Sequence, residues 1–396
     1  MSQPLRLKKN ADRRLKAGHL WIYSNEVDTR ETPLKAFQAG ELARVEASNG
    51  RALGVGYVNP GSLICARVMS RDPAMKVDRS LFVHRFKQAL SLRERLYSGP
   101  FYRLVHAEGD LLPGLVVDRF SDVVVVQLNT AGMEVLGEAI VDALEKVIKP
   151  AAIVFRNDTG ERRQEGLAER VEVVSGTLPE EVLIEENGVR FAVPVLDGDY
   201  TGWRFGHRDS RAWLNRHVAG KRVLDLFSGA GGFGVQAAAS GASEVLCVDA
   251  SGDALEQAAH NAELNGVHEQ VAIGEGDALE ALAALKADGE RFDVVVLDPP
   301  ALIRKRRDSN SGERAYGRFN REAMRLLGRD GLLLTASSSM HLAPERLMDV
   351  VRGAARHQDR HGQVIFQGHQ AADHPVHPAI PETSTLKALG VRVFRD

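Results

Sequence analysis

The residues of this sequence that could bind a nucleoside gather around a glycine-rich turn in its second half. Residues 223–227 form an apolar run with one acidic member, Asp225, which predicts a buried strand of a parallel sheet. Gly229 and Gly231 follow, and glycines let the backbone turn sharply and a ligand approach N–H groups at a helix N-terminus. The next apolar run ends in Asp249, about 20 residues farther on, the spacing of a carboxylate that binds ribose hydroxyls. We therefore predict a nucleoside site at this turn.

A later apolar run, residues 292–298, ends in Asp298, which Pro299 and Pro300 follow directly. A carboxylate before two prolines makes a rigid lip at a strand end, where a base could be held. Residues 229–234 also match the G-x-G-x-x-G pattern, so a dinucleotide oxidoreductase stays open, although such enzymes do not need the lip. A turn that only packs a helix on a sheet, and binds nothing, is the structural alternative.

A third strand end, Gly276-Asp277-Ala278, lies between these two in the chain. Together the three strand ends resemble those of the class I methyltransferases, which use S-adenosylmethionine. The resemblance implies that Asp249 binds the ribose of this cofactor and that Asp277 and Ala278 contact its adenine. The cofactor-binding residues that it implies are Arg208, Phe227, Ser228, Gly229, Gly231, Asp249, Ala250, Asp277, Ala278 and Asp298.

The composition is that of an ordinary soluble globular protein long enough for two or three domains. Of the 396 residues, 44% are hydrophobic and 26% are charged, which are average proportions. No apolar run is long enough to span a membrane and no signal peptide opens the chain. Cys65 and Cys247 both lie in apolar runs, which argues against disulfides and zinc ribbons. These features predict a cytoplasmic enzyme with no membrane partner.

Charge is distributed unevenly along the chain. The first 100 residues hold 18 Lys and Arg against 9 Asp and Glu, a net charge of +9, which leaves −11 for the remainder. A basic N-terminal segment followed by a neutral-to-acidic segment indicates a nucleic-acid-binding domain attached to an enzyme. A basic but merely solvated surface is the alternative.

The elements that position these residues fall into three predicted domains. Short runs separated by glycines predict a small β-barrel in residues 1–75, which resembles a PUA domain, an RNA-binding barrel. Residues 76–190 combine helical and strand patterns and predict a compact α+β domain. From residue 191 to residue 396, strand and helix patterns alternate, which predicts a Rossmann-like α/β domain with a parallel sheet and helices on both faces.

Two basic clusters are candidates for contacts with RNA. The first lies in the predicted barrel, where cations precede Trp21 and Tyr23, and cations beside aromatics suit phosphates and unstacked bases. Trp21 fits the barrel core better than a base-binding surface. The second directly follows the proline lip, where a solvated loop is the alternative. The predicted RNA-binding residues are Lys8, Lys9, Arg13, Arg14, Arg304, Lys305, Arg306 and Arg307.

The whole chain resembles the bacterial 23S rRNA 5-methylcytosine methyltransferases of the large ribosomal subunit. The resemblance implies an RNA substrate, S-adenosylmethionine as cofactor, and a catalytic set that contains Asp298, Pro299 and Ser338. The matching segments are Thr201-Gly202, Arg208-Asp-Ser-Arg211, Phe227-Ser228, Gly231-Gly-Phe233, Asp298-Pro-Pro300 and Gln370-Ala-Ala-Asp-His-Pro375.

The chain departs from this family at two places. The family has Leu-Asp-Gln-Arg where residues 205–208 read Phe-Gly-His-Arg, which keeps Arg208 for the methionine carboxylate. The family also has Ser-Cys-Ser where this chain has Ser338 in the place of the cysteine. Methylation of cytosine at C5 needs a nucleophile that adds to the ring, and a serine hydroxyl is a poor one without a dedicated base.

We therefore predict an S-adenosylmethionine-dependent RNA methyltransferase that acts on a base of 23S rRNA. The alternative is a catalytically silent RNA-binding paralogue that retains the fold, and the two departures favour it. His369, His374 and His377 have no companion spacing of a standard metal site, so no metal is expected. The sequence leaves open a homodimer, the target nucleotide and the methylated atom.

Overall fold

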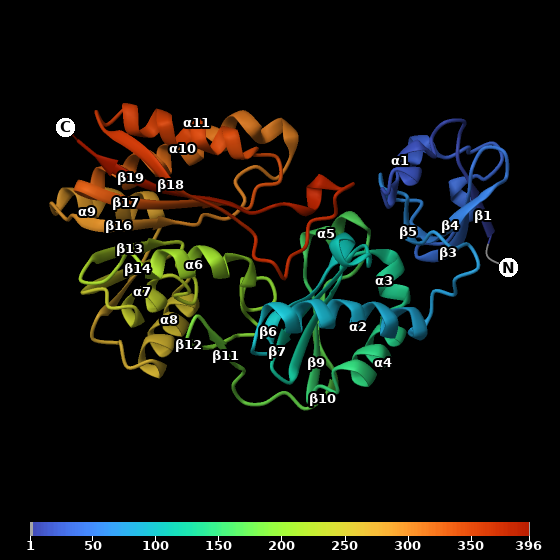
Figure 1. Cartoon of the computed structure of the whole chain (residues 1–396), viewed down its shortest axis with the longest axis horizontal. Coiled ribbons are helices and arrows are strands. Elements are labelled where there is room, and N and C mark those ends of the chain that lie inside the picture. The colour runs from blue at the N-terminus through green and yellow to red at the C-terminus, as the bar shows by residue number, and fades with distance from the viewer. Residues whose placement is uncertain (1–2, 396) are drawn as a thin grey trace. The chain divides into compact units, whose positions relative to one another are not determined.

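The computed structural model describes residues 3–395, whose contacts divide the chain into two compact units (Figure 1). Unit 1 consists of Met1–Val182, Pro194–Phe205 and Ala372–Thr383. Unit 2 consists of Leu183–Val193, Gly206–Ala371 and Ser384–Asp396. Each unit is thus assembled from segments far apart in the sequence. The three-domain division at residues 75 and 190 stays a prediction.

The first sheet of unit 1 is built from short strands, as the glycine-separated runs predict. Its order is β1-β3-β4-β5-β2, and only β1 and β3 pair in parallel. Leu5, Val45 and Ala66 lie in its buried core beside the one-turn helix α1 (Arg13–Lys16). The strands are β1 (Gln3–Arg6), β2 (Trp21–Ile22), β3 (Glu41–Glu46), β4 (Ala52–Val58) and β5 (Ala66–Ser70).

A second sheet of unit 1 has the order β10-β9-β8-β7-β6, in which only β8 and β9 pair in parallel. Helices α2 and α4 contact each other, and their apolar residues share one core with this sheet. Tyr57 of β4 reaches the same core and donates a hydrogen bond from its hydroxyl to the carbonyl of Pro113. The elements are α2 (Arg79–Leu96), β6 (Phe101–His106), β7 (Leu115–Phe120), β8 (Val123–Leu128), α3 (Ala131–Val135), α4 (Gly137–Val147), β9 (Ala152–Asn157), α5 (Gly160–Gln164) and β10 (Arg170–Gly176).

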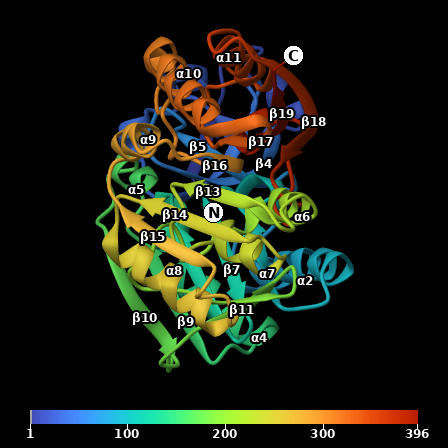
Figure 2. The ribbon, with the colours of Figure 1, turned by 90° about the vertical axis from the view of Figure 1, so that its left-hand side faces the viewer.

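Unit 2 is built on a seven-stranded sheet of order β15-β14-β13-β16-β17-β19-β18 (Figure 2). The first five strands are parallel, as predicted. The expectation of a parallel sheet is wrong for the last two, since β19 runs antiparallel to both β17 and β18. The strands are β13 (Arg222–Leu226), β14 (Glu244–Asp249), β15 (Val271–Glu275), β16 (Phe292–Leu297), β17 (Leu327–Ser337), β18 (His361–His369) and β19 (Lys387–Phe394).

Helices cover both faces of this sheet because alternate residues of each strand point to opposite sides. Val223 and Val294 lie in a core shared with helices α6, α7 and α8. Their neighbours Leu224 and Val295 lie in another core, shared with α9, α10 and α11. The helices are α6 (Arg208–Asn215), α7 (Gly234–Ala239), α8 (Gly252–Leu264), α9 (Ala278–Ala287), α10 (Ser309–Leu326) and α11 (Pro344–Arg356).

A hairpin of β11 (Leu183–Glu186) and β12 (Val189–Ala192) also belongs to unit 2. Its second strand is tied to α8, where the N–H of Ala192 donates to Asn261 Oδ1 over 2.8 Å. The hairpin was not predicted from the sequence. It places the side chain of Glu186 in the interior of unit 2, where that carboxylate is 2% exposed.

Candidate active site

The predicted cofactor residues follow the carboxyl ends of neighbouring parallel strands in unit 2. The chain leaves β13 toward β14 on one side, and β16 lies on the other side of β13. In open α/β sheets, such a reversal of strand order creates a crevice beyond the carboxyl ends of the strands. Phe227, Asp249 and Asp298 each stand at the end of one of these three strands. The structure therefore brings the sequence candidates to one sheet edge, and their contacts with a cofactor stay predictions.

The glycine turn has one open position and one packed position. Gly229 has a φ of +52°, and a Cβ built on it would meet no atom within 4 Å. Its N–H donates a hydrogen bond to Asp249 Oδ2 over 2.9 Å. Gly231 has a φ of +78°, and its Cβ would come within 2.7 Å of Val235 Cγ2 and 3.1 Å of Ala258 Cβ. Gly229 thus leaves room for a ligand, whereas packing against helices explains Gly231.

Asp225, the acidic member of β13, is a buried support for the turn. Its Oδ2 accepts a hydrogen bond from the N–H of Gly234 over 2.8 Å. A Cβ on Gly234 would lie 2.4 Å from Cys247 Sγ, so only glycine brings that N–H so close to the sheet. The pKa of Asp225 is raised to about 7. Burial is the main cause, and the nearby carboxylates of Asp298 and Asp249 contribute in the same direction.

Asp225→Asn should reduce the pH dependence of stability. The native pKa of Asp225, about 7, lies above its unfolded value of about 3.9, so the carboxyl group binds a proton more tightly in the native state. The contribution of Asp225 to stability should be greatest below pH 4 and fall by about 1.4 kcal/mol per pH unit up to pH 7. Urea unfolding from pH 4 to 8 should show a flatter curve for Asp225→Asn than for the control Asp253→Asn, an exposed carboxylate. Identical curves for these two variants would contradict the assignment.

His207 is a site residue that the sequence analysis missed as a chemical group. Its Nε2 lies 3.1 Å from Asp298 Oδ2, and both side chains are buried. Its ring meets the ring of Phe233 edge to face, with centroids 5.5 Å apart. Its Nδ1 is buried and has no hydrogen-bond partner among residues 3–395. Because the carboxylate accepts from Nε2–H, Nδ1 of the neutral ring is a free proton acceptor.

Two arginines at the start of α6 share one buried carboxylate. Arg208 Nε lies 3.5 Å from Glu186 Oε2, and Arg211 Nη1 lies 2.7 Å from Glu186 Oε1. Gln236 Nε2 donates to the same Oε1 over 3.0 Å. The guanidinium of Arg211 also lies over the ring of Phe233, 5.3 Å from its centroid. Glu186 therefore holds Arg211 by a short ion pair and makes a longer contact with Arg208, the predicted carboxylate-binding residue. No motif in the sequence could identify Glu186, because it stands in a short hairpin.

The strand end at residues 276–278 contains an aspartate whose side chain caps a helix. Asp277 Oδ1 caps helix α9, accepting hydrogen bonds from the N–H groups of Leu279 and Glu280 over 2.8 and 3.3 Å. Ala278 is buried against the core, whereas Ala250 is exposed. A helix cap alone is a sufficient reason for an aspartate at this position. The predicted contacts of Asp277 and Ala278 with adenine stay predictions.

Ser338 directly follows β17 and lies between two serines that are tied to Tyr316. The Tyr316 hydroxyl lies 2.8 Å from Ser337 Oγ and 2.9 Å from Ser339 Oγ. Ser338 Oγ is buried and has no hydrogen-bond partner in the described part of the chain.

Lys387 is a cationic group that contacts this serine segment. Its Nζ donates to the carbonyls of Ser339 and Leu342, over 2.6 and 2.9 Å. Burial lowers the pKa of Lys387 to about 8. None of these contacts places a proton acceptor on Ser338.

The predicted RNA-binding residues are mostly exposed, but Arg14 already forms an ion pair within the protein. In unit 1, Arg14 pairs with Glu26 over 3.2 Å and its guanidinium lies 4.7 Å from the ring centroid of Tyr23. Trp21 is half-buried against the core of the first sheet and donates from Nε1 to Glu108 over 2.7 Å. Lys8, Lys9 and Arg13 in unit 1 and Arg304, Lys305, Arg306 and Arg307 in unit 2 are exposed.

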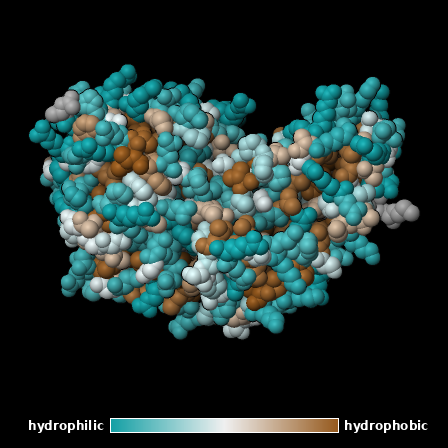
Figure 3. All heavy atoms as spheres, in the orientation of Figure 1, coloured by the Kyte–Doolittle hydropathy of each residue, from teal (hydrophilic) through white to brown (hydrophobic). Residues whose placement is uncertain are grey.

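Neither a membrane span nor a metal site is found among residues 3–395. No helix in this range is long and apolar enough to cross a membrane. No group of three or more His, Cys, Asp or Glu side chains in it could hold a metal ion. The face shown in Figure 3 is mostly hydrophilic, with hydrophobic residues in scattered patches.

Known proteins match the chain from end to end. A family model described as a PUA-like domain matches residues 5–71, and one described as an S-adenosylmethionine-dependent methyltransferase matches residues 103–392. Ribosomal RNA large subunit methyltransferase I of Tolumonas auensis is 37% identical over 100% of both chains, and its counterpart in Shewanella denitrificans matches equally. A solved S-adenosylmethionine-dependent methyltransferase from Streptococcus mutans has a TM-score of 0.83 at 19% identity, over 98% of this chain and 100% of that chain. The predicted α/β class, with a PUA-like start and a methyltransferase fold, is confirmed.

Proposed function

This chain belongs to the S-adenosylmethionine-dependent methyltransferases, in the group that includes the ribosomal RNA large subunit methyltransferases I, and from this premise we propose that it methylates a base of large-subunit ribosomal RNA. The buried pair of His207 and Asp298 at the end of β16 carries the proposal. It supplies a proton acceptor at the sheet edge where the family binds its cofactor.

The residues at this edge fit S-adenosylmethionine. Gly229 leaves open space beside its backbone, which permits close approach of a ligand. In this proposal Asp249, whose Oδ2 accepts a hydrogen bond from the N–H of Gly229, binds the ribose hydroxyls, and Arg208 binds the methionine carboxylate. When bound, this cofactor supplies an electrophilic methyl group on a sulfonium sulfur.

His207 and Asp298 are proposed to remove the proton that the base loses. When a methyl group adds to a nitrogen or carbon that bears hydrogen, a proton must leave for the product to be neutral. Asp298 stabilises the imidazolium that forms when His207 Nδ1 accepts a proton, because its carboxylate holds Nε2–H at 3.1 Å. Pro299 and Pro300 restrict the backbone after Asp298, which keeps the carboxylate in place.

The target atom is proposed to be one with its own lone pair, such as a base nitrogen. Methylation at C5 of cytosine is the finer expectation from the family resemblance, and it requires a nucleophile to add to the ring first. Ser338 Oγ has no hydrogen-bond acceptor in the described residues and so no base to activate it. An atom with a lone pair attacks the methyl group directly and needs alignment rather than a covalent adduct.

A catalytically silent RNA-binding protein is the second candidate, because the family resemblance implies a cysteine at the place of Ser338. Calorimetry with S-adenosylmethionine, S-adenosylhomocysteine and NAD should show binding of the first two. Mass-spectrometric mapping of ribosomal RNA, with and without the gene, should then show one modified large-subunit nucleotide that disappears with the gene. Cofactor binding without a modification would favour the silent protein, and tight binding of NAD alone would end the methyltransferase proposal. Cytoplasmic location and a homodimer stay predictions.

A further inference from the structure

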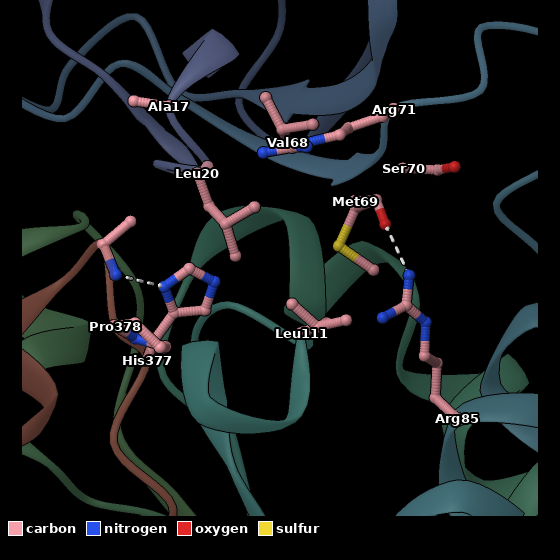
Figure 4. A pocket seen from close by; sticks show the side chains of 12 residues that line it. Ala17, Leu20, Val68, Met69, Ser70, Arg71, Arg85, Leu111, His377 and Pro378 are labelled. Carbon is pink, nitrogen blue, oxygen red and sulfur yellow. Dashed lines mark hydrogen bonds between the residues drawn. The ribbon is translucent and has the colours of Figure 1, made fainter. Parts of the chain in front are cut away.

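Unit 1 contains a cavity of about 600 Å³ that the cofactor site does not use (Figure 4). Its walls come from the end of β5, from Arg85 on α2, from Leu111 and from the segment 377–379. Cavities of this size hold small organic ligands, and a nucleotide falls within the range. The sequence analysis assigned no role to any of these residues.

Two arginines, Arg71 and Arg85, line the cavity together with no acidic residue. Arg85 Nη2 donates to the carbonyl of Met69, and Arg71 Nη2 donates to that of Leu15, each over 3.3 Å. Neither arginine forms an ion pair within residues 3–395, and the cavity lining includes no acidic residue. Each guanidinium has five N–H donors, so most of the donors at this cavity remain available.

The fully buried arginines of unit 1, in contrast, are paired with carboxylates. Arg93 pairs with Asp110 over 2.6 Å, and Arg162 pairs with Glu134 over 2.8 Å. Arg85 is half-buried, and burial lowers its pKa with no opposing acidic group. Arg71 is exposed, so both guanidinium groups can be reached by an anion, and neither has a carboxylate partner that such an anion would have to displace.

Most of the remaining lining is apolar. In Figure 4, Leu20 lies above the His377 ring and Leu111 lies to its right. The ring accepts a hydrogen bond at Nδ1 from the N–H of Ala379 over 3.2 Å, so Nε2 of the neutral ring carries its hydrogen. Leu111 holds a left-handed φ of +60° with its side chain 39% exposed, an uncommon state for a branched residue.

We propose that this cavity binds one unstacked nucleotide of the RNA substrate, with its phosphate on Arg71 and Arg85 and its base against His377. The inference rests on the proposed function, which makes RNA the substrate. Guanidinium groups bind phosphate oxygens with two donors at once, and unstacked bases pack on flat rings. The site holds the RNA and takes no part in the methyl transfer.

Arg71→Ala and Arg85→Ala test the site in the full-length chain. Anisotropy with a labelled large-subunit rRNA fragment should show about tenfold weaker binding for each variant. The salt dependence of log K should fall by about 0.7 for each lost phosphate contact. Lys87→Ala removes an exposed cation from the same helix outside the cavity and should change affinity less than about twofold. Calorimetry should show unchanged affinity for S-adenosylmethionine, and Arg85→Lys should recover part of the RNA affinity.

Three outcomes would overturn the site. If both arginine variants match Lys87→Ala in affinity and salt slope while the unmutated protein methylates rRNA, the cavity is not an RNA site although the proposed function stands. If cytidine 5′-monophosphate binds the cavity without displacing RNA, it is a site for free nucleotides. If the unmutated protein binds no RNA, the proposed function fails together with the site.

Discussion

Asp298→Asn should lower kcat for methyl transfer by about a thousandfold, because it removes the charge that stabilises a protonated His207. Asp298 Oδ2 lies 3.1 Å from His207 Nε2, and both side chains are buried. An asparagine keeps the shape of the aspartate but cannot balance an imidazolium. Affinity for S-adenosylmethionine should change much less than kcat, which calorimetry would measure.

His207→Gln and Asp293→Asn separate chemistry from structure. Glutamine can still donate a hydrogen bond to Asp298 but cannot accept a proton, so kcat should fall. Asp293 lies on the same strand, about half exposed, and accepts a hydrogen bond from the N–H of Arg222, which asparagine also accepts. Asp293→Asn should therefore retain full activity. Full activity in His207→Gln would show that the pair only supports the fold.

The central strands of unit 2 could be predicted closely because most of their residues are buried. Such strands are continuous apolar runs, and residues 244–249 and 292–298 were expected almost as β14 and β16 are observed. The glycine turn could be predicted as well, since Gly229 needs a positive φ. The antiparallel direction of β19 was missed, although residues 370–386 contain no α-helix that could form a parallel crossover.

The elements and site residues that were not predicted have weaker patterns in the local sequence. Strand β10 is mostly exposed and its residues 170–176 alternate polar and apolar types only in part. Glu186 acts on Arg211 across 25 positions of sequence, and such a pair has no periodicity. His207 could have been flagged, since an imidazole in a segment placed near the cofactor is a candidate acid or base. It was treated only as a departure from the family pattern.

Ser338→Cys should create activity at C5 of cytosine where the parent has none, a gain of at least about a hundredfold over background. A cysteine is a few per cent thiolate at neutral pH, and a thiolate adds to a pyrimidine ring, whereas an unassisted hydroxyl does not. The change breaks no hydrogen bond, because Ser338 Oγ makes none among the described residues. Mass spectrometry of methylated rRNA would separate 5-methylcytosine from nitrogen-methylated products.

Ser338→Ala tests whether the native reaction needs the serine hydroxyl. We expect its native activity to stay within about twofold of that of the parent. Its structural control is Ser339→Ala, which removes the Oγ that contacts Tyr316 and accepts from the N–H of Ile303 over 3.1 Å. Ser339→Ala should lower thermal stability, whereas Ser338→Ala should not. A parent enzyme that makes 5-methylcytosine and loses it in Ser338→Ala would establish serine as the nucleophile. Its proton would then need an acceptor outside the loop, since Ser337, Ser339 and Lys387 are all committed to other partners.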